Sequence, residues 1–135
     1  MPERRRRMGP KAKIMVVEDN LDEAKLIKMV LEGEGYEAAC AFNGKEALEK
    51  LKSEKPDLIV LDIMMPEMDG FTFCSKLRSI PENEDIPVVF LTGVAKHIRE
   101  SKYPLDGVMR AEVDDYLEKP VKAEELLATI SGLLK

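Results

Sequence analysis

The sequence predicts an α/β protein in which a parallel sheet carries helices on both faces. Strand-like runs alternate five times with runs of helical period, and such alternation returns each strand to the sheet in the same direction. The central run, Leu58 to Leu61, is continuously apolar, which is typical of a strand buried on both faces. A chain of 135 residues is long enough for one domain with one core.

The first half of the chain contains two strand–helix units and the central strand. Asn20 is expected to cap the first helix, with Glu23 three residues later in an arrangement like a capping box. Gly33 and Gly35 are expected to end this helix, and Asn43 opens the second one. The five strands are expected at residues 11–17, 36–42, 58–61, 86–91 and 113–117.

The second half continues the alternation less regularly. A third helix follows Gly70 and ends before Pro81, and residues 81–85 are expected to form a loop. The last helix places five apolar residues on one face: Leu126, Leu127, Ile130, Leu133 and Leu134.

The composition is that of an ordinary soluble domain. The chain is 44% hydrophobic and 35% charged, and its net charge of −5 argues against general nucleic-acid binding by the folded part. No apolar run approaches the roughly 18 residues of a membrane span, and no signal peptide is apparent. Cys40 and Cys74 are expected to be free thiols in a reducing cytoplasm.

Residues 1–10 hold four consecutive arginines and are expected to be a disordered basic tail. The alternative is a tail that contacts nucleic acid or an acidic partner.

Polar residues stand where four of the strands end. They are Glu18 and Asp19, then Asp62, Thr92 and Lys119. The carboxyl ends of parallel strands share one edge of the sheet, where reaction sites lie in this architecture. Three carboxylates gathered there would repel each other by roughly 4 kcal/mol per pair at about 4 Å. The cluster therefore needs a cation or a bound proton, and all-oxygen ligands favour Mg²⁺, with Mn²⁺ possible.

A lysine and a hydroxyl beside a carboxylate and a hard cation suit phosphoryl transfer onto the carboxylate. Such transfer depends mainly on positioning and on neutralising the phosphoryl oxygens. Each residue also has an ordinary explanation: Thr92 could cap a turn, Lys119 could be solvated, and Tyr116 could be a half-buried core aromatic. Their joint occurrence favours the phosphoryl-transfer interpretation.

The chain resembles the receiver domains of two-component response regulators, including the single-domain chemotaxis type. The matching motifs are Val16-Val17-Glu18-Asp19, Asp57 to Pro66 with Met68-Asp69-Gly70, Ile86 to Thr92, and Asp114 to Pro120. The resemblance covers residues 12–134 and implies a receiver domain at 11–135. It also implies a flavodoxin-like, three-layer α/β/α fold with strand order 2-1-3-4-5.

The resemblance implies a magnesium site and a phosphoacceptor. Asp62 would accept the phosphoryl group. Asp19 and Asp62 would bind Mg²⁺ directly, the backbone carbonyl of Met64 would be the third protein ligand, and Glu18 would act through water.

The resemblance also implies a switch. Thr92 would reach for the phosphoryl group, Lys119 would pair with it, and Tyr116 would swing inward. The bond before Pro120 is expected to be cis. Gly93, which has no side chain, would leave the site open to water or a phosphatase.

The fourth connection departs from the family pattern. Thr92 and Lys119 are 27 positions apart by subtraction (119 − 92), longer than is usual for the family. Pro104 interrupts any continuous helix there, and Ala111-Glu112-Val113 stands where the family often has a glycine. We therefore expect an irregular or split fourth helix. His97 is expected on the surface and not in a phosphorelay.

The function implied is that of a cytoplasmic phosphoacceptor switch, not an enzyme, although it could assist its own phosphorylation and dephosphorylation. Its partners would be a histidine kinase or phosphotransfer protein and a downstream protein bound through residues 94–135, with no DNA-binding domain and no membrane contact. It would be a monomer or a phosphorylation-dependent dimer, and either a stand-alone regulator or a piece of a longer protein.

The alternative is a docking module with this fold that carries no phosphate. A flavin-binding protein is disfavoured, because Glu18-Asp19-Asn20 would repel a cofactor phosphate.

Overall fold

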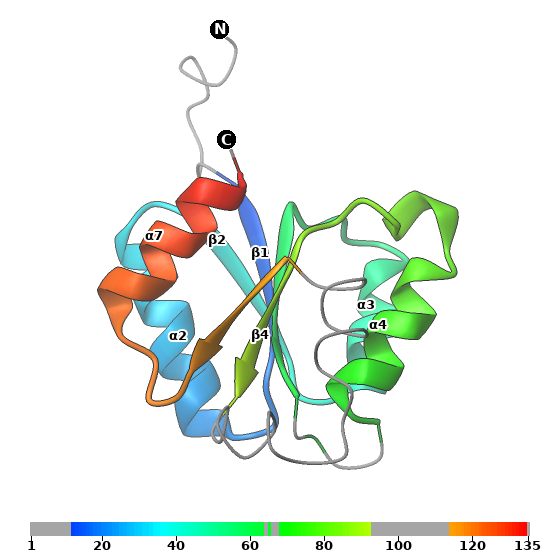
Figure 1. Ribbon diagram of the computed structural model, residues 1–135, viewed down its shortest axis with the longest axis horizontal. Helices are drawn as coiled ribbons and strands as arrows, with labels where there is room; N and C mark the ends of the chain where they lie inside the picture. The colour runs from blue at the N-terminus through cyan, green and yellow to red at the C-terminus, as the bar shows by residue number, and fades with distance from the viewer. Residues whose placement is uncertain (1–11, 64, 66–67, 93–113, 135) are drawn as a thin grey trace, which may run out of the picture.

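In the part of the chain that the structure describes, a five-stranded parallel sheet lies between two pairs of helices (Figure 1). The computed structural model describes residues 12–63, 65, 68–92 and 114–134. The strands are β1 (Lys13–Val17), β2 (Glu37–Ala41), β3 (Leu58–Asp62), β4 (Val88–Thr92) and β5 (Asp115–Glu118). Their order is β2-β1-β3-β4-β5, and every neighbouring pair is parallel. The predicted α/β class and strand order are confirmed.

The helices cover the two faces of the sheet in pairs. They are α2 (Leu21–Gly33), α3 (Gly44–Leu51), α4 (Gly70–Arg78) and α7 (Ala123–Leu133). Helices α2 and α7 lie on one face, and α3 and α4 lie on the other (Figure 1). Parallel neighbours in a sheet need crossover connections, and α2, α3 and α4 supply them for the first four strands.

The segment expected as a loop after α4 contains one turn of 3-10 helix, η1 (Pro81–Asn83), so that expectation was wrong. Pro81 occupies the first turn, where its fixed φ suits a helix and its missing N–H costs nothing. The Glu84 N–H closes the turn on the Pro81 carbonyl at 3.3 Å.

The sheet divides the core into two halves. In β3, Leu58 and Val60 pack towards α2 and α7, whereas Ile59 and Leu61 pack towards α3 and α4. All four are fully buried, which agrees with the expected strand buried on both faces. Because β3 is central, its last residue is carried to the middle of the sheet edge.

The helix ends agree with the capping signals in the sequence. The side chains of Asn20 and Asn43 accept the backbone N–H of the residue three positions later, at 3.0 and 2.7 Å. Asp69 caps α4 in the same way, accepting the Thr72 N–H at 2.8 Å. After α2, Gly35 has φ 99°, a left-handed conformation that glycine adopts without strain.

One arginine ties the loop before β4 to the start of β5. The Arg78 guanidinium donates to the carbonyls of Glu84 and Ile86 at 2.9 and 2.7 Å. It also lies 3.9 Å from Asp114, whose carboxylate accepts the Val88 N–H at 2.9 Å. These contacts fix the amino ends of β4 and β5, at the edge of the sheet opposite Asp62.

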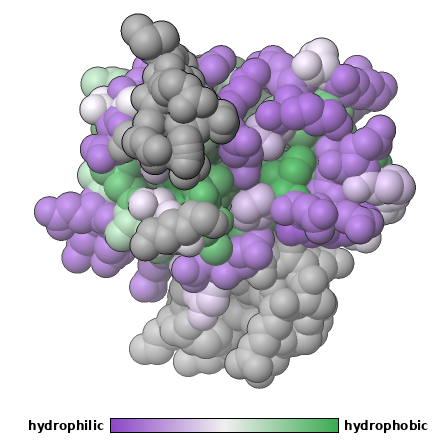
Figure 2. All heavy atoms as spheres, turned by 90° about the horizontal axis from the view of Figure 1, so that it is seen from above, coloured by the Kyte–Doolittle hydropathy of each residue, from purple (hydrophilic) through white to green (hydrophobic). Residues whose placement is uncertain are grey.

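Figure 2 shows the molecule from this opposite edge, where hydrophilic side chains form most of the coloured surface and hydrophobic ones show mainly in the middle. Cys40 and Cys74 are not joined in a disulfide, which agrees with the expectation from the sequence. Within the described residues, no helix has both the length and the apolar character needed to cross a membrane.

Several expectations fall on segments outside the described residues. They are the basic tail at 1–10, the Met64 carbonyl, Gly93, His97 and the irregular fourth helix within 93–113.

Candidate functional site

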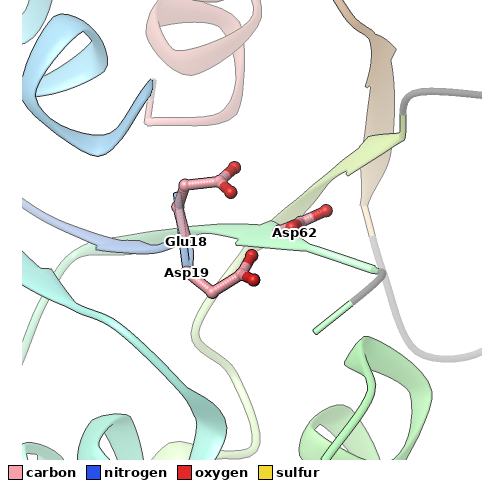
Figure 3. Close-up of side chains that lie close together, drawn as sticks. All are labelled: Glu18, Asp19 and Asp62. Atoms are coloured by element: carbon pink, nitrogen blue, oxygen red, sulfur yellow. The ribbon is translucent and has the colours of Figure 1, made fainter. Parts of the chain in front are cut away.

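Three carboxylates meet at the carboxyl ends of the two central strands. Glu18 and Asp19 directly follow β1, and Asp62 is the last residue of β3. Because Val17 lies opposite Leu61 in the parallel register, Glu18 and Asp62, which directly follow these two residues, become neighbours. One oxygen from each of the three carboxylates lies within 4.8 Å of the others. Figure 3 shows the three side chains pointing into the same region beyond the strand ends.

Two of these carboxylates are buried. Glu18 is 1% exposed and Asp62 is 3% exposed, whereas Asp19 faces solvent. The Asn20 N–H donates to Oε2 of Glu18 at 3.1 Å, but Oε1 of Glu18 is buried without a hydrogen bond. The same oxygen forms an ion pair with Nζ of Lys119 at 3.0 Å. Such an oxygen has spare capacity to accept a further ligand.

Burial raises the pKa of Glu18 to about 7 from its ordinary value of 4.5. The Lys119 ammonium and the Asn20 N–H oppose this effect, and the nearby charge of Asp62 adds to it. Glu18 is therefore poised to hold a proton near neutral pH when no cation is bound.

Lys119 lies among the carboxylates. Its Nζ is 2.8 Å from Glu23, 3.0 Å from Glu18 and 3.6 Å from Asp62. Burial disfavours the charged form of Lys119, but the contacts with the carboxylates of Glu23 and Glu18 and the charge of Asp62 outweigh burial and raise the pKa of Lys119 above its usual range. The Lys119–Pro120 peptide bond is cis.

Thr92 and Tyr116 lie on neighbouring strands beside this cluster. Thr92 ends β4 and is 1% exposed, and its carbonyl accepts the Lys119 N–H at 2.8 Å. Tyr116 pairs with Phe90 in the register, two residues before Thr92, so the side chains of Thr92 and Tyr116 leave the sheet on the same face. The Tyr116 side chain is exposed, at 38%.

The structure thus brings together five of the residues singled out in the sequence: Glu18, Asp19, Asp62, Thr92 and Lys119. It also adds one that was missed. Glu23 had been interpreted only as part of a helix cap, yet its carboxylate is the nearest partner of Lys119. The only available signal was its position in the first turn of the helix that follows the carboxylates.

The donor set fits a hard divalent cation. Among the described residues, three carboxylates lie within ion-pair distance of the Lys119 ammonium, and Asp19 lies beside two of them. The cluster of four carboxylates and one ammonium therefore keeps an excess of negative charge when all are ionised. Carboxylate oxygens on an open edge, one of them buried without a hydrogen bond, are the ligands that Mg²⁺ prefers.

The raised pKa of Glu18 gives a testable pH dependence in metal-free protein. A folded-state pKa of about 7 against 4.5 means that the folded protein binds this proton more tightly than the unfolded chain does. The resulting stability is present below about pH 4.5 and is lost as the pH rises to about 7. Native protein should therefore lose about 3 kcal/mol relative to Glu18→Gln across this window.

Urea unfolding of both proteins in a chelator, at the two ends of this pH window, measures the effect. The Gln variant cannot titrate at this position but keeps every other titrating group. The difference between the two proteins therefore cancels the contribution of those other groups. A stability difference between the two proteins that stays constant with pH would contradict the assignment.

Comparison with known proteins identifies the family. The model of the response regulator receiver domain matches residues 14–131. Response regulator MprA from Mycolicibacterium vanbaalenii is 38% identical over 123 residues, which are 91% of this chain and 50% of that protein. The chain thus spans about half the length of this curated relative.

Two solved structures extend the likeness to the fold. Chemotaxis protein CheY4 from Vibrio cholerae has a TM-score of 0.81 at 30% identity, with 91% of this chain and 98% of that chain covered. Response regulator TrrA from Thermotoga maritima, solved in complex with Mg(2+)-BeF, has a TM-score of 0.76 at 33% identity, covering 90% and 98%. The chain belongs to the response regulator receiver domain family of two-component signal transduction. The predicted family is confirmed.

Proposed function

We propose that the chain is a Mg²⁺-dependent phosphoacceptor that receives a phosphoryl group on Asp62 from a histidine kinase or a phosphotransfer protein. The observation that carries the proposal is the environment of the Asp62 carboxylate. It is almost fully buried, its oxygen lies within 4.8 Å of those of Glu18 and Asp19, and Nζ of Lys119 is 3.6 Å away. A buried carboxylate beside a lysine and further carboxylates is suited to accept an anionic group only when a cation is shared.

The transfer forms one bond and breaks another. An Asp62 carboxylate oxygen attacks the phosphorus of a phosphohistidine, so an O–P bond forms while the N–P bond breaks. The bonding pair of the N–P bond stays on the imidazole nitrogen, which takes up a proton. Nucleophilic attack requires ionised Asp62, and the charge of Lys119 at 3.6 Å favours that form.

The cation would be held by Asp19 and Asp62 directly, with Glu18 acting through water and the Met64 carbonyl as a further ligand. Bound Mg²⁺ would neutralise the carboxylates and the phosphoryl oxygens. The complex of the relative TrrA with Mg(2+)-BeF supports this choice of cation.

Phosphorylation would then bias a two-state switch. The buried Thr92 hydroxyl would bond a phosphoryl oxygen, and Lys119 would pair with another. The exposed Tyr116 ring lies on the same face as Thr92, so the space that Thr92 leaves is where the ring would move inward. The chain acts as a switch in this proposal and not as an enzyme.

The remaining proposals concern the wider protein. Residues 11–135 would form the receiver domain, with 1–10 as a basic tail, and the protein would work in the cytoplasm. A downstream partner would bind through residues 94–135. The protein itself would be a monomer or a phosphorylation-dependent dimer.

Intact mass after incubation with acetyl phosphate and Mg²⁺ tests the proposal. Native protein should gain one phosphoryl group, and the gain should disappear in a chelator or in Asp62→Asn. Asp69→Asn is the matched control: it also removes a carboxylate, but asparagine caps a helix as well as aspartate does. Failure of native protein to gain mass from both acetyl phosphate and a phosphorylated histidine phosphotransfer protein would overturn the proposal in favour of a docking module.

A further inference from the structure

The same four-residue pattern begins two helices of this protein, but its last residue behaves differently in each. Asn20 and Asn43 are the N-caps of α2 and α3, and Glu23 and Glu46 stand three residues later. In both helices the asparagine side chain accepts the backbone N–H of the glutamate. A capping box would also turn the glutamate side chain back towards the start of its own helix.

Glu46 follows this rule and Glu23 does not. Oε1 of Glu46 accepts the Phe42 N–H at 2.8 Å, just before the helix. At the start of α2 the Asn20 N–H is instead bonded to Glu18. The Glu23 carboxylate is thereby released from capping and extends to Lys119, at 2.8 Å. The arrangement links the first helix to the strand-end lysine.

The distances show how Lys119 is shared in this state. The contact with Glu23 is the shortest of the three, and the contact with Asp62 is the longest, at 3.6 Å. Glu18 and Asp62 are buried, whereas the Glu23 side chain is 44% exposed. Glu23 is therefore the partner that loses least when the lysine leaves, because water can solvate its carboxylate.

We propose that Glu23 is a positioning residue that holds Lys119 back from Asp62 and releases it when negative charge is added at Asp62. The proposal rests on the proposed function of Asp62 and goes beyond it. Glu23 does not touch the reacting atoms; it acts through Lys119. The contact between Glu23 and Lys119 thereby stabilises the unphosphorylated state, in which Lys119 is held away from Asp62.

The energetic consequence has a definite sign. The Glu23–Lys119 ion pair exists in this state and must break when Lys119 moves to a phosphoryl oxygen, so it opposes the switched state. Removing the charge of Glu23 removes that cost. Loss of an exposed ion pair of this kind should increase the affinity for a phosphoryl mimic about two- to fivefold.

Titration with beryllofluoride in saturating Mg²⁺, followed by backbone amide resonances, measures this affinity. Glu23→Gln should bind beryllofluoride about two- to fivefold more tightly than native protein. The backbone bond from residue 23 to Asn20 is retained in this variant, so the helix cap is kept. Asp22→Asn is the matched control, because it removes the same charge from the same helical turn and should leave the affinity unchanged.

A second readout separates positioning from a structural role. The ¹⁵N resonance of the Lys119 ammonium, in metal-free protein, should shift in Glu23→Gln and not in Asp22→Asn. In a Lys119→Gln background, Glu23→Gln should no longer change the affinity for beryllofluoride.

Two outcomes would overturn the inference. If native protein binds beryllofluoride but Glu23→Gln binds it equally or more weakly, the inference fails and the proposed function stands. If native protein and Asp62→Asn are equally insensitive to beryllofluoride, the proposed function fails and the inference fails with it.

Discussion

Replacing Gly70 by valine is expected to destabilise the protein by about 3 kcal/mol or more. A Cβ atom at this position would lie 2.9 Å from Cα of Ile63, 3.3 Å from the Asp62 carbonyl oxygen and 3.4 Å from the Phe90 ring. Two of these neighbours are backbone atoms, so the clash cannot be relieved by a rotamer change. The Gly70 N–H also donates to the Ile63 carbonyl at 2.8 Å, which fixes the start of α4 against the end of β3.

Because the clash moves the residue that precedes Ile63, the same variant should also reduce phosphoryl acceptance by Asp62. Urea unfolding measures the first effect, and the acetyl phosphate assay measures the second. Gly132→Val in α7 is the matched control, since nothing lies within 4 Å of an added Cβ there, and its stability should stay within about 0.5 kcal/mol of native. Equal losses in the two variants would contradict the close approach of α4 to β3.

Replacing Lys119 by methionine is expected to cost about 3 kcal/mol in metal-free protein at about pH 8. The change keeps much of the apolar stem but leaves the buried carboxylates of Glu18 and Asp62 without their ammonium partner. Below about pH 7 the cost should shrink, because Glu18 can then hold a proton. Saturating Mg²⁺ should restore part of the loss and should stabilise the variant more than it stabilises native protein.

Lys28→Met provides the control for Lys119→Met. Nζ of Lys28 is 2.6 Å from Glu32, closer than any contact of Lys119, but both side chains are exposed. Such a surface pair contributes little to stability, because water screens both charges. Urea unfolding of both variants with and without Mg²⁺ should separate them clearly; a similar cost for the two would show that burial of the Lys119 cluster has no energetic consequence.

The sheet and its row of carboxylates could be predicted because both follow from short-range pattern and topology. Once alternating units make the sheet parallel, Glu18, Asp19 and Asp62 must emerge at the same edge. The strand order came from the family resemblance, which the register confirms.

Side-chain choices between competing partners could not be read from the sequence. Glu23 and Glu46 share one local pattern, and only the tertiary position of Lys119 decides that Glu23 leaves the cap. The start of the last strand was also misplaced. It was expected at residue 113, but β5 begins at Asp115, because the side chain of Asp114 accepts the Val88 N–H ahead of the strand.

The division of the core by the sheet has an evolutionary consequence. Side chains beneath α3 and α4 form one cluster, and those beneath α2 and α7 form another. Substitutions on opposite sides share few side-chain contacts, so their free-energy costs should add. A destabilising substitution in the cluster beneath α3 and α4 can therefore be compensated within that cluster. The cluster beneath α2 and α7, which supports Glu23 and Lys119, should evolve independently of it.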